Sequence, residues 1–445
     1  GASMKILKSY LKERFIIALI IISAVLSILA IKTVYNKRDD MAYYNYMERY
    51  NDMYTSLQSQ AELGMVKKNS MDYKAKLWHA QSMKKMAEYY KESGRKNWQK
   101  INDLEFMQIL YLVEFGEDVD VDNSFYNKNK KDIEKYYNLE DEDIDFSKLR
   151  AYYLKNPAQK DETFLERIPT WKLSLKYYLN SKKNNRDVLS VQNPSAYNYL
   201  FENYSESIYK NILIVFMILV GAFLVNNSKK TKSYDLLGEV SSKKEIFYHY
   251  IKYAFLISMI IIFLTDLISF LYMGFKEGFF GFSSNMLIYK KGLYTPKTYD
   301  NIYEVATYLG LSKLMATDVL YATNNSFVFN TFNDLSMIKM PLFLALSFLV
   351  ETLKIFVFST MGVVFALLLK NKGYVISMLA VIFGIISNFL MSFQKSFNFF
   401  SYPTGWNVVL GYTHVSFLSC FIILIIFSLL FTLLGRRLFN RREVL

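Results

Sequence analysis

Cysteine is almost absent from this sequence, whose single example, Cys420, lies in an apolar run. One thiol cannot form a disulfide within the chain, so a domain outside the cytoplasm has to be stabilised by packing alone. The chain also lacks the GxxxxGK(S/T) phosphate-binding pattern and the HExxH, CxxC and GxSxG patterns, and its three histidines are far apart: His79, His249 and His414. These absences predict a chain that is not an enzyme, does not hydrolyse nucleotide by itself, and holds no metal or cofactor of its own.

The net charge of +13 is spread unevenly along the chain. Residues 32–208 contain 28 Lys or Arg and 28 Asp or Glu, so this long polar stretch is neutral. The surplus lies in short segments that adjoin apolar runs and together hold 16 basic and 5 acidic residues: 5–14, 229–252, 370–372 and 436–443. This pattern is typical of the cytoplasmic loops of membrane proteins, so we expect membrane lipid and no nucleic acid among the partners.

Apolar residues make up 52% of the chain and are concentrated in six runs: 15–31, 208–225, 249–272, 341–369, 374–392 and 414–434. About 20 such residues suffice to cross a bilayer. The sequence therefore predicts a mainly α-helical, polytopic membrane protein with six transmembrane helices and both termini in the cytoplasm. Lys greatly outnumbers Arg, and Asn, Ile, Tyr and Phe are heavily used, which suggests a bacterial protein of the cell membrane.

The two ends of the chain are interpreted as follows. Gly1-Ala2-Ser3 precedes the first methionine and is expected to be an expression scar, so residues 4–31 form a cytoplasmic N-terminus and the first span. A cleavable signal peptide is the rival interpretation. Residues 27–30 lack the small-x-small pattern of a cleavage site, so we expect an uncleaved anchor. Residues 436–445 are expected to form a cytoplasmic tail.

Two segments are predicted to lie outside the cytoplasm. Residues 32–207, between the first two spans, form the larger one, where apolar residues recur at helical spacing, as at 104, 107, 110 and 111. Its tyrosine pairs, such as 136–137 and 177–178, either cover a small helical core or form an aromatic surface that captures an amphipathic peptide or lipid. Residues 273–340 form the second segment, after spans 2 and 3 (208–272) and before spans 4 to 6 (341–435).

Three charged residues, Asp266, Glu351 and Lys354, fall within predicted spans. Charged side chains are costly in hydrocarbon and are usually paired or functional. Glu351 and Lys354 are three residues apart and share one helix face. Either they form an ion pair, joined by Asp266, that fixes how helices pack, or they belong to a translocation path or outer gate.

The predicted cytoplasmic loop 226–248 is the candidate docking site for a partner ATPase. Its charged residues surround a short apolar stretch, and the candidate coupling residues are Leu236, Leu237, Gly238, Glu239, Ser241, Lys243, Lys244 and Glu245. The alternative is a solvated basic loop that only sets orientation. Orientation requires the basic residues but not the two leucines, and an apolar patch among charges suits a groove on another protein.

The order of these elements resembles the membrane subunit of an ABC-2-type ABC exporter. The residues that carry the resemblance are 234–246, YDLLGEVSSKKEI, where leucines and a glycine precede a small residue, two basic residues and a branched apolar residue. The resemblance covers the first span and about residues 210–445. It implies a short coupling helix in this loop, six spans, and a separate ATPase subunit that binds ATP and Mg. The chain departs from the family in its enlarged external segments, and 402–406 matches the family's external re-entrant helices only loosely.

The resemblance implies an exporter permease that works as a homo- or heterodimer, with a second permease copy or homologue and two cytoplasmic ABC ATPase subunits. The large external domain suggests an amphipathic substrate, such as an antimicrobial or signalling peptide, that is exported or cleared from the membrane. Two alternatives stay open. One is an ABC-linked mechanotransmission subunit whose spans work the external domain, and the other is a membrane-anchored receptor or scaffold whose external domain binds a ligand.

Overall fold

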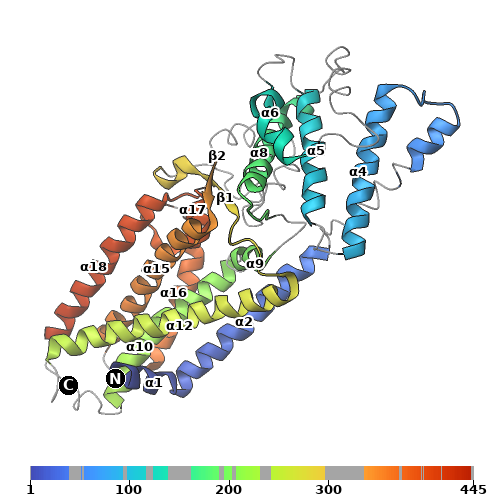
Figure 1. Cartoon of the computed structure of the whole chain (residues 1–445). Coiled ribbons are helices and arrows are strands. Elements are labelled where there is room, and N and C mark those ends of the chain that lie inside the picture. The colour runs from blue at the N-terminus through green and yellow to red at the C-terminus, as the bar shows by residue number, and fades with distance from the viewer. Residues whose placement is uncertain are drawn as a thin grey trace.

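Most of the chain is helical, as the sequence predicts. The computed structural model describes residues 2–39, 52, 55–93, 98–116, 124–138, 162–189, 195–202, 207–230, 242–295, 335–369, 373–391, 393, 395–411 and 413–441. Long helices lie side by side in a bundle, and a group of shorter helices stands at one end of it (Figure 1). The chain's two ends, the start of α1 and the end of α18, lie at the opposite end of the bundle.

The bundle contains α2 (Arg14–Asp39), α10 (Ser207–Lys230), α12 (Lys243–Glu277), α15 (Met340–Leu368), α16 (Gly373–Met391) and α18 (Phe417–Arg441). Among the described residues, four of these helices, α10, α12, α15 and α18, are long and apolar enough to cross a bilayer. The apolar stretches Arg14–Leu29 and Val375–Leu390, in α2 and α16, are shorter. The predicted membrane character is therefore supported, and four of the six predicted runs reach spanning length.

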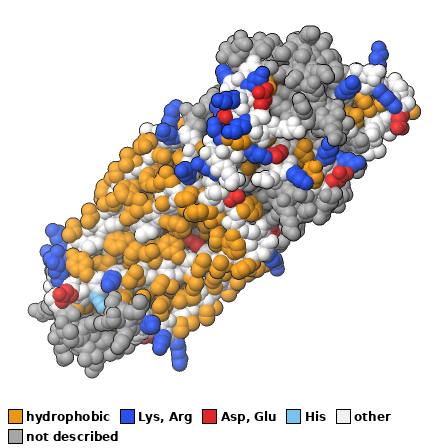
Figure 2. Space-filling view, in the orientation of Figure 1, with side chains coloured by type: hydrophobic (Ala, Val, Ile, Leu, Met, Phe, Trp, Pro, Cys, Tyr) orange, Lys and Arg blue, Asp and Glu red, His pale blue; other side chains and the backbone are white. Residues whose placement is uncertain are grey.

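The surface of the bundle is apolar along its length. Figure 2 shows hydrophobic side chains over the visible face of the bundle, with Lys and Arg gathered at its two ends. Exposed large side chains include Ile21 of α2, Ile385 of α16 and Leu433 of α18, each more than half exposed. Such a face is unfavourable in water. It suits the hydrocarbon of a membrane, because lipid tails are as apolar as the side chains that they would contact.

The third long helix, α12, differs from its predicted bounds. The sequence predicts a span over residues 249–272 that follows a loop ending at 248. In the structure α12 already begins at Lys243, and the preceding helix, α10, extends to Lys230. The cause is a capping box: the backbone N–H of Glu245 donates to the Ser242 hydroxyl at 3.3 Å, and the backbone N–H of Ser242 donates to the Glu245 carboxylate at 2.8 Å. The described ends therefore shorten the predicted loop 226–248 on both sides.

A short amphipathic helix, α1 (Ala2–Leu11), precedes the bundle. Ile6, Leu7 and Tyr10 pack against the bundle core, whereas Lys8 is exposed. The Tyr10 ring lies 5.6 Å from the ring of Tyr253 on α12. The helix therefore packs on the end of the bundle, with Ile6, Leu7 and Tyr10 inward and Lys8 outward. Sequence patterning did not predict it.

The bundle is centred on the crossing of α10 and α15. A Cβ atom added to Gly221 of α10 would lie 2.9 Å from the backbone nitrogen of Val363, and one added to Gly362 of α15 would lie 2.9 Å from the carbonyl carbon of Ile218. Real side chains do not tolerate such approaches. The two glycines therefore let the backbones touch, as small residues do between membrane helices.

The shorter helices form a polar domain with its own core. It contains α4 (Met71–Ser93), α5 (Trp98–Gly116), α6 (Phe125–Tyr136) and α8 (Glu162–Lys183). Trp78, Phe106, Trp171 and Tyr178 are buried together, and the ring of Phe106 stacks on that of Tyr137 with centroids 3.7 Å apart. Tyr177 and Tyr178 are both nearly inaccessible, so this tyrosine pair belongs to the interior.

Short elements connect the polar domain to the bundle. Strand β1 (Asn285–Tyr289) pairs antiparallel with β2 (Leu335–Lys339), and β2 leads directly into α15. Helix α9 (Ala196–Glu202) packs against both α2 and α12. The 3-10 turns η3 (Lys290–Leu293) and η5 (Phe399–Ser401) and helix α17 (Gly405–Leu410) fill the same end of the bundle. The two-stranded sheet was not predicted, although it is compatible with the predicted, mainly α-helical architecture.

The core of the polar domain contains an acidic side chain, Glu105 of α5. It is 8% exposed, and its carboxylate accepts a hydrogen bond of 2.8 Å from the Tyr178 hydroxyl on α8. Burial raises the pKa of Glu105 to about 7, although the Tyr178 hydrogen bond acts in the opposite direction. The neutral form is therefore the one that fits this core.

The polar domain is expected to lose stability as the pH rises from 4.5 to 7. In this range folded Glu105 retains a proton that the unfolded chain releases. Glu105→Gln should remove this part of the pH dependence and stabilise the domain at pH 8, by on the order of 3 kcal/mol. Urea unfolding followed by tryptophan fluorescence measures it, since Trp78, Trp98 and Trp171 report on this domain. Glu88→Gln, which removes an exposed carboxylate, is the control. An unchanged pH profile in Glu105→Gln would contradict the assignment.

Candidate functional site

Two of the charged residues inside the bundle form a buried ion pair on α15. Lys354 Nζ lies 3.2 Å from Glu351 Oε1, and the two side chains are 5% and 14% exposed. Lys354 Nζ also donates to the carbonyl oxygen of Pro403 at 3.2 Å, and the backbone N–H of Gly405 donates to Glu351 Oε1 at 2.5 Å. Both charged groups therefore have partners on the segment that leads into α17.

The local sequence allows α17 to approach α15 closely. A Cβ atom on Gly405 would lie 3.2 Å from Glu351 Cγ and 3.1 Å from the carbonyl carbon of Ser347, so only glycine fits there. The next residue, Trp406, is 1% exposed and lies against Phe343 and Phe348 of α15. The ion pair and the indole ring together hold α17 against α15.

Asp266 of α12 does not share hydrogen bonds with this pair. Its side chain is 8% exposed, and Oδ1 has no hydrogen-bond partner in the part of the chain that the structure describes. Glu351 is close enough to act on it electrostatically. The sequence placed Asp266 with the pair as a possible third member. The structure brings it within electrostatic reach of Glu351 but leaves Oδ1 without a hydrogen-bond partner among the described residues.

The predicted coupling residues are only partly described. Leu236, Leu237, Gly238, Glu239 and Ser241 lie outside the described residues. Lys243, Lys244 and Glu245 form the first turn of α12, where Lys244 and Glu245 are exposed and Glu245 completes the capping box. Lysines at a helix N-terminus oppose the helix dipole, so their position has to be explained by something other than the stability of α12.

A second set of polar contacts, which sequence reasoning missed, joins the polar domain to the end of α12. Asp187, just after α8, accepts hydrogen bonds from the backbone N–H of Gly281 at 2.8 Å and from the Ser283 hydroxyl at 2.9 Å. Arg186 Nη1 donates to Asn285 Oδ1 at 2.5 Å, and Asn285 Nδ2 donates to Asn180 Oδ1 at 2.8 Å. We call residues 180–187 and 281–285 the junction.

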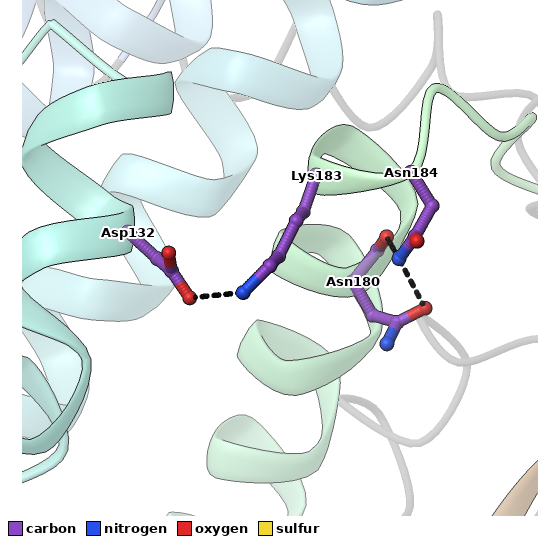
Figure 3. A network of polar contacts seen from close by, with 4 residues as sticks. All are labelled: Asp132, Asn180, Lys183 and Asn184. Carbon is purple, nitrogen blue, oxygen red and sulfur yellow. Dashed lines mark hydrogen bonds and ion pairs between the residues drawn. The ribbon is translucent and has the colours of Figure 1, made fainter.

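The end of α8 is itself fixed by polar contacts on both sides (Figure 3). Lys183 points toward α6 and donates to Asp132 at 2.8 Å, while Asn184 turns back to donate to the carbonyl oxygen and the side chain of Asn180. The Asn- and Lys-rich sequence at 180–187 marks a helix end. Its partners, about a hundred residues away, could not be identified from that pattern.

No protein family model, no curated protein and no solved structure matches this chain. Its class is therefore argued from its own helices and charges.

The buried pair is expected to contribute strongly to stability. Lys354→Met leaves Glu351 buried without its counter-ion and should lower the free energy of unfolding by about 3–5 kcal/mol, whereas the double variant with Glu351→Gln should cost less than the sum of the single changes. Thermal unfolding of the detergent-solubilised chain measures this. The control is the exposed pair of Lys84 and Glu88, 3.9 Å apart, which should contribute less than about 1 kcal/mol. Transport that fails in a normally stable Lys354→Met would instead favour an outer gate.

Proposed function

We propose that the chain is the membrane permease subunit of an ATP-driven ABC exporter in a bacterial cell membrane, with six spans. The observation that carries this proposal is the distribution of the helix ends. The ends of α10 and α18 and the starts of α1 and α12 lie at one end of the bundle, opposite the polar domain (Figure 1). Each of these ends bears Lys or Arg in the sequence, which suits the cytoplasmic face of a membrane.

In this proposal the segment between α10 and α12 docks a separate ABC ATPase, and ATP and Mg bind to that partner. The exposed Lys244 and Glu245 at the start of α12 adjoin the segment that holds Leu236 and Leu237. A short apolar stretch among charged residues suits a groove on another protein, and α12, which follows it in the chain, would carry its movement into the bundle. A second permease copy or a homologue completes the transporter, and its substrate is an amphipathic molecule such as an antimicrobial or signalling peptide.

Leu236→Asp combined with Leu237→Asp should abolish binding of the ATPase, because two charges cannot enter an apolar groove. The tagged chain is purified from its own host in mild detergent, and mass spectrometry identifies co-eluting chains that contain a phosphate-binding loop. Thr231→Asp combined with Ser233→Asp is the matched control, since it adds the same charge to the same segment. Absence of any such ATPase from the wild-type eluate would support a receptor or scaffold instead.

The junction favours a second candidate function, mechanotransmission. Helix α12 is continuous for 35 residues, about 52 Å, and is followed immediately by the loop that Asp187 and Arg186 hold. A displacement at its start would be carried along one unbroken helix almost to the junction. In this function ATP hydrolysis moves the polar domain, and no cargo crosses the membrane.

Asp187→Ala separates the two candidates. In mechanotransmission it should leave ATP hydrolysis by the complex intact and abolish the ATP-dependent change in hydrogen exchange of α8. Asp132→Ala breaks the Lys183 ion pair but leaves the hydrogen bonds between residues 180–187 and 281–285 in place, so it should preserve that change. Substrate transport into inverted vesicles that continues at the wild-type rate in Asp187→Ala would support the exporter.

A further inference from the structure

Asp266 differs from the two other charged residues that the sequence places within predicted spans, Glu351 and Lys354. The ammonium group of Lys354 is held by Glu351 and Pro403. The three charged residues therefore carry a net charge of −1 when ionised, and Glu351 acts electrostatically on Asp266. A buried, unpaired carboxylate is costly, and it favours the approach of a positive group.

Aromatic rings lie where α12 meets α15, one turn from Asp266 along α12. Phe263, one turn earlier on α12, has its ring centroid 5.3 Å from that of Phe348 on α15, and Phe348 lies 5.1 Å from Trp406 on α17. Phe201 of α9 approaches Trp406 from a third direction at 5.0 Å. Four elements thus bring ring faces and edges to the region where α12 meets α15.

Further buried polar atoms in this region also lack partners. Trp406 Nε1, Ser347 Oγ and Thr404 Oγ1 have no hydrogen-bond partner within the described part of the chain, and the three residues are at most 2% exposed. Thr404 and Trp406 flank Gly405, which touches both Ser347 and Glu351. Native interiors satisfy nearly all such groups, so several unsatisfied ones beside Gly405, whose N–H donates to Glu351, point to a ligand next to α15 and α17.

We propose that Asp266 and the aromatic rings between α12, α15 and α17 bind an organic cation, such as the ammonium group of an amphipathic molecule. An inorganic cation such as calcium requires six to eight oxygen ligands, and the described residues contain no group of three or more His, Cys, Asp or Glu side chains that could hold a metal. Aromatic faces instead favour ammonium and larger organic cations. The carboxylate neutralises the charge, and the hydroxyl and indole groups complete its polar contacts.

This site rests on the proposed function, because it assigns positive charge to the exported substrate. The same ammonium chemistry is present in two sources, a free amphipathic amine and an aminolipid headgroup. The binding experiment needs no ATPase. If decylammonium does not bind, the result of the ATPase co-purification still stands. If no ATPase co-purifies, the binding experiment can still be interpreted.

The test is equilibrium binding of tritiated decylammonium to the full chain in nanodiscs of phosphatidylglycerol, with decanol as the neutral analogue. Wild type should bind decylammonium saturably. Asp266→Asn, which keeps the shape and removes the charge, should bind it at least about tenfold more weakly. Glu277→Gln is the matched control, since it makes the same charge change about three turns further along α12. Exchange of half the lipid for phosphatidylethanolamine should weaken apparent binding if the lipid headgroup is the source, and leave it unchanged if the free amine is.

The melting temperature of the ligand-free chain provides a second measurement. In alkaline buffer Asp266→Asn should raise it, because an ionised Asp266 would be an uncompensated buried charge, whereas a carboxyl group that served only packing would lower it on removal. Equal binding of decylammonium by wild type and Asp266→Asn would overturn the proposal. Equal binding of decanol and decylammonium by wild type would also overturn it, since it would indicate apolar partition at an uncharged Asp266.

Discussion

The direct contact between the backbones of α10 and α15 is the constraint on which the bundle depends. Apolar side chains gain little by leaving lipid for a protein interior, so close packing has to supply what the hydrophobic effect supplies in water. Gly221 and Gly362 provide it by removing the side chains that would keep the helices apart. With α15 fixed at the centre, α12, α17 and α18 pack against its remaining faces.

The buried charged residues on α15 and on its neighbour α12 are of two kinds. Glu351 and Lys354 satisfy one another and the backbone at Pro403 and Gly405, so their charges contribute to structure. Asp266, on the neighbouring helix, has comparable burial and no such partner for Oδ1 among the described residues. The contrast matters because intramembrane charge is tolerated either by pairing or for function. The pair explains how α17 is held, whereas no such structural contact accounts for Asp266 Oδ1 among the described residues.

The sequence predicted the features that depend on local pattern. Hydropathy located the apolar helices, and three-residue spacing placed Glu351 and Lys354 on one face. The Ser242–Glu245 capping box, which sets the start of α12, is likewise a local sequence pattern. Contacts between distant segments were out of reach, because nothing local to Pro403, Gly405 or Asp187 identifies its partner. The pairing of β1 with β2, whose residues lie about fifty positions apart, belongs to the same category.

The position of α9 has a consequence for how such a chain can diversify. The chain leaves the bundle through α2 and returns through α9, and these two helices pack on one another and on α12. Insertions are tolerated where entry and exit lie close together. The polar domain is therefore exchangeable in evolutionary terms, since a different insert could replace it without reordering a single bundle helix. A new insert would need only a few side chains equivalent to those at 180–187, which form hydrogen bonds with residues 281–285.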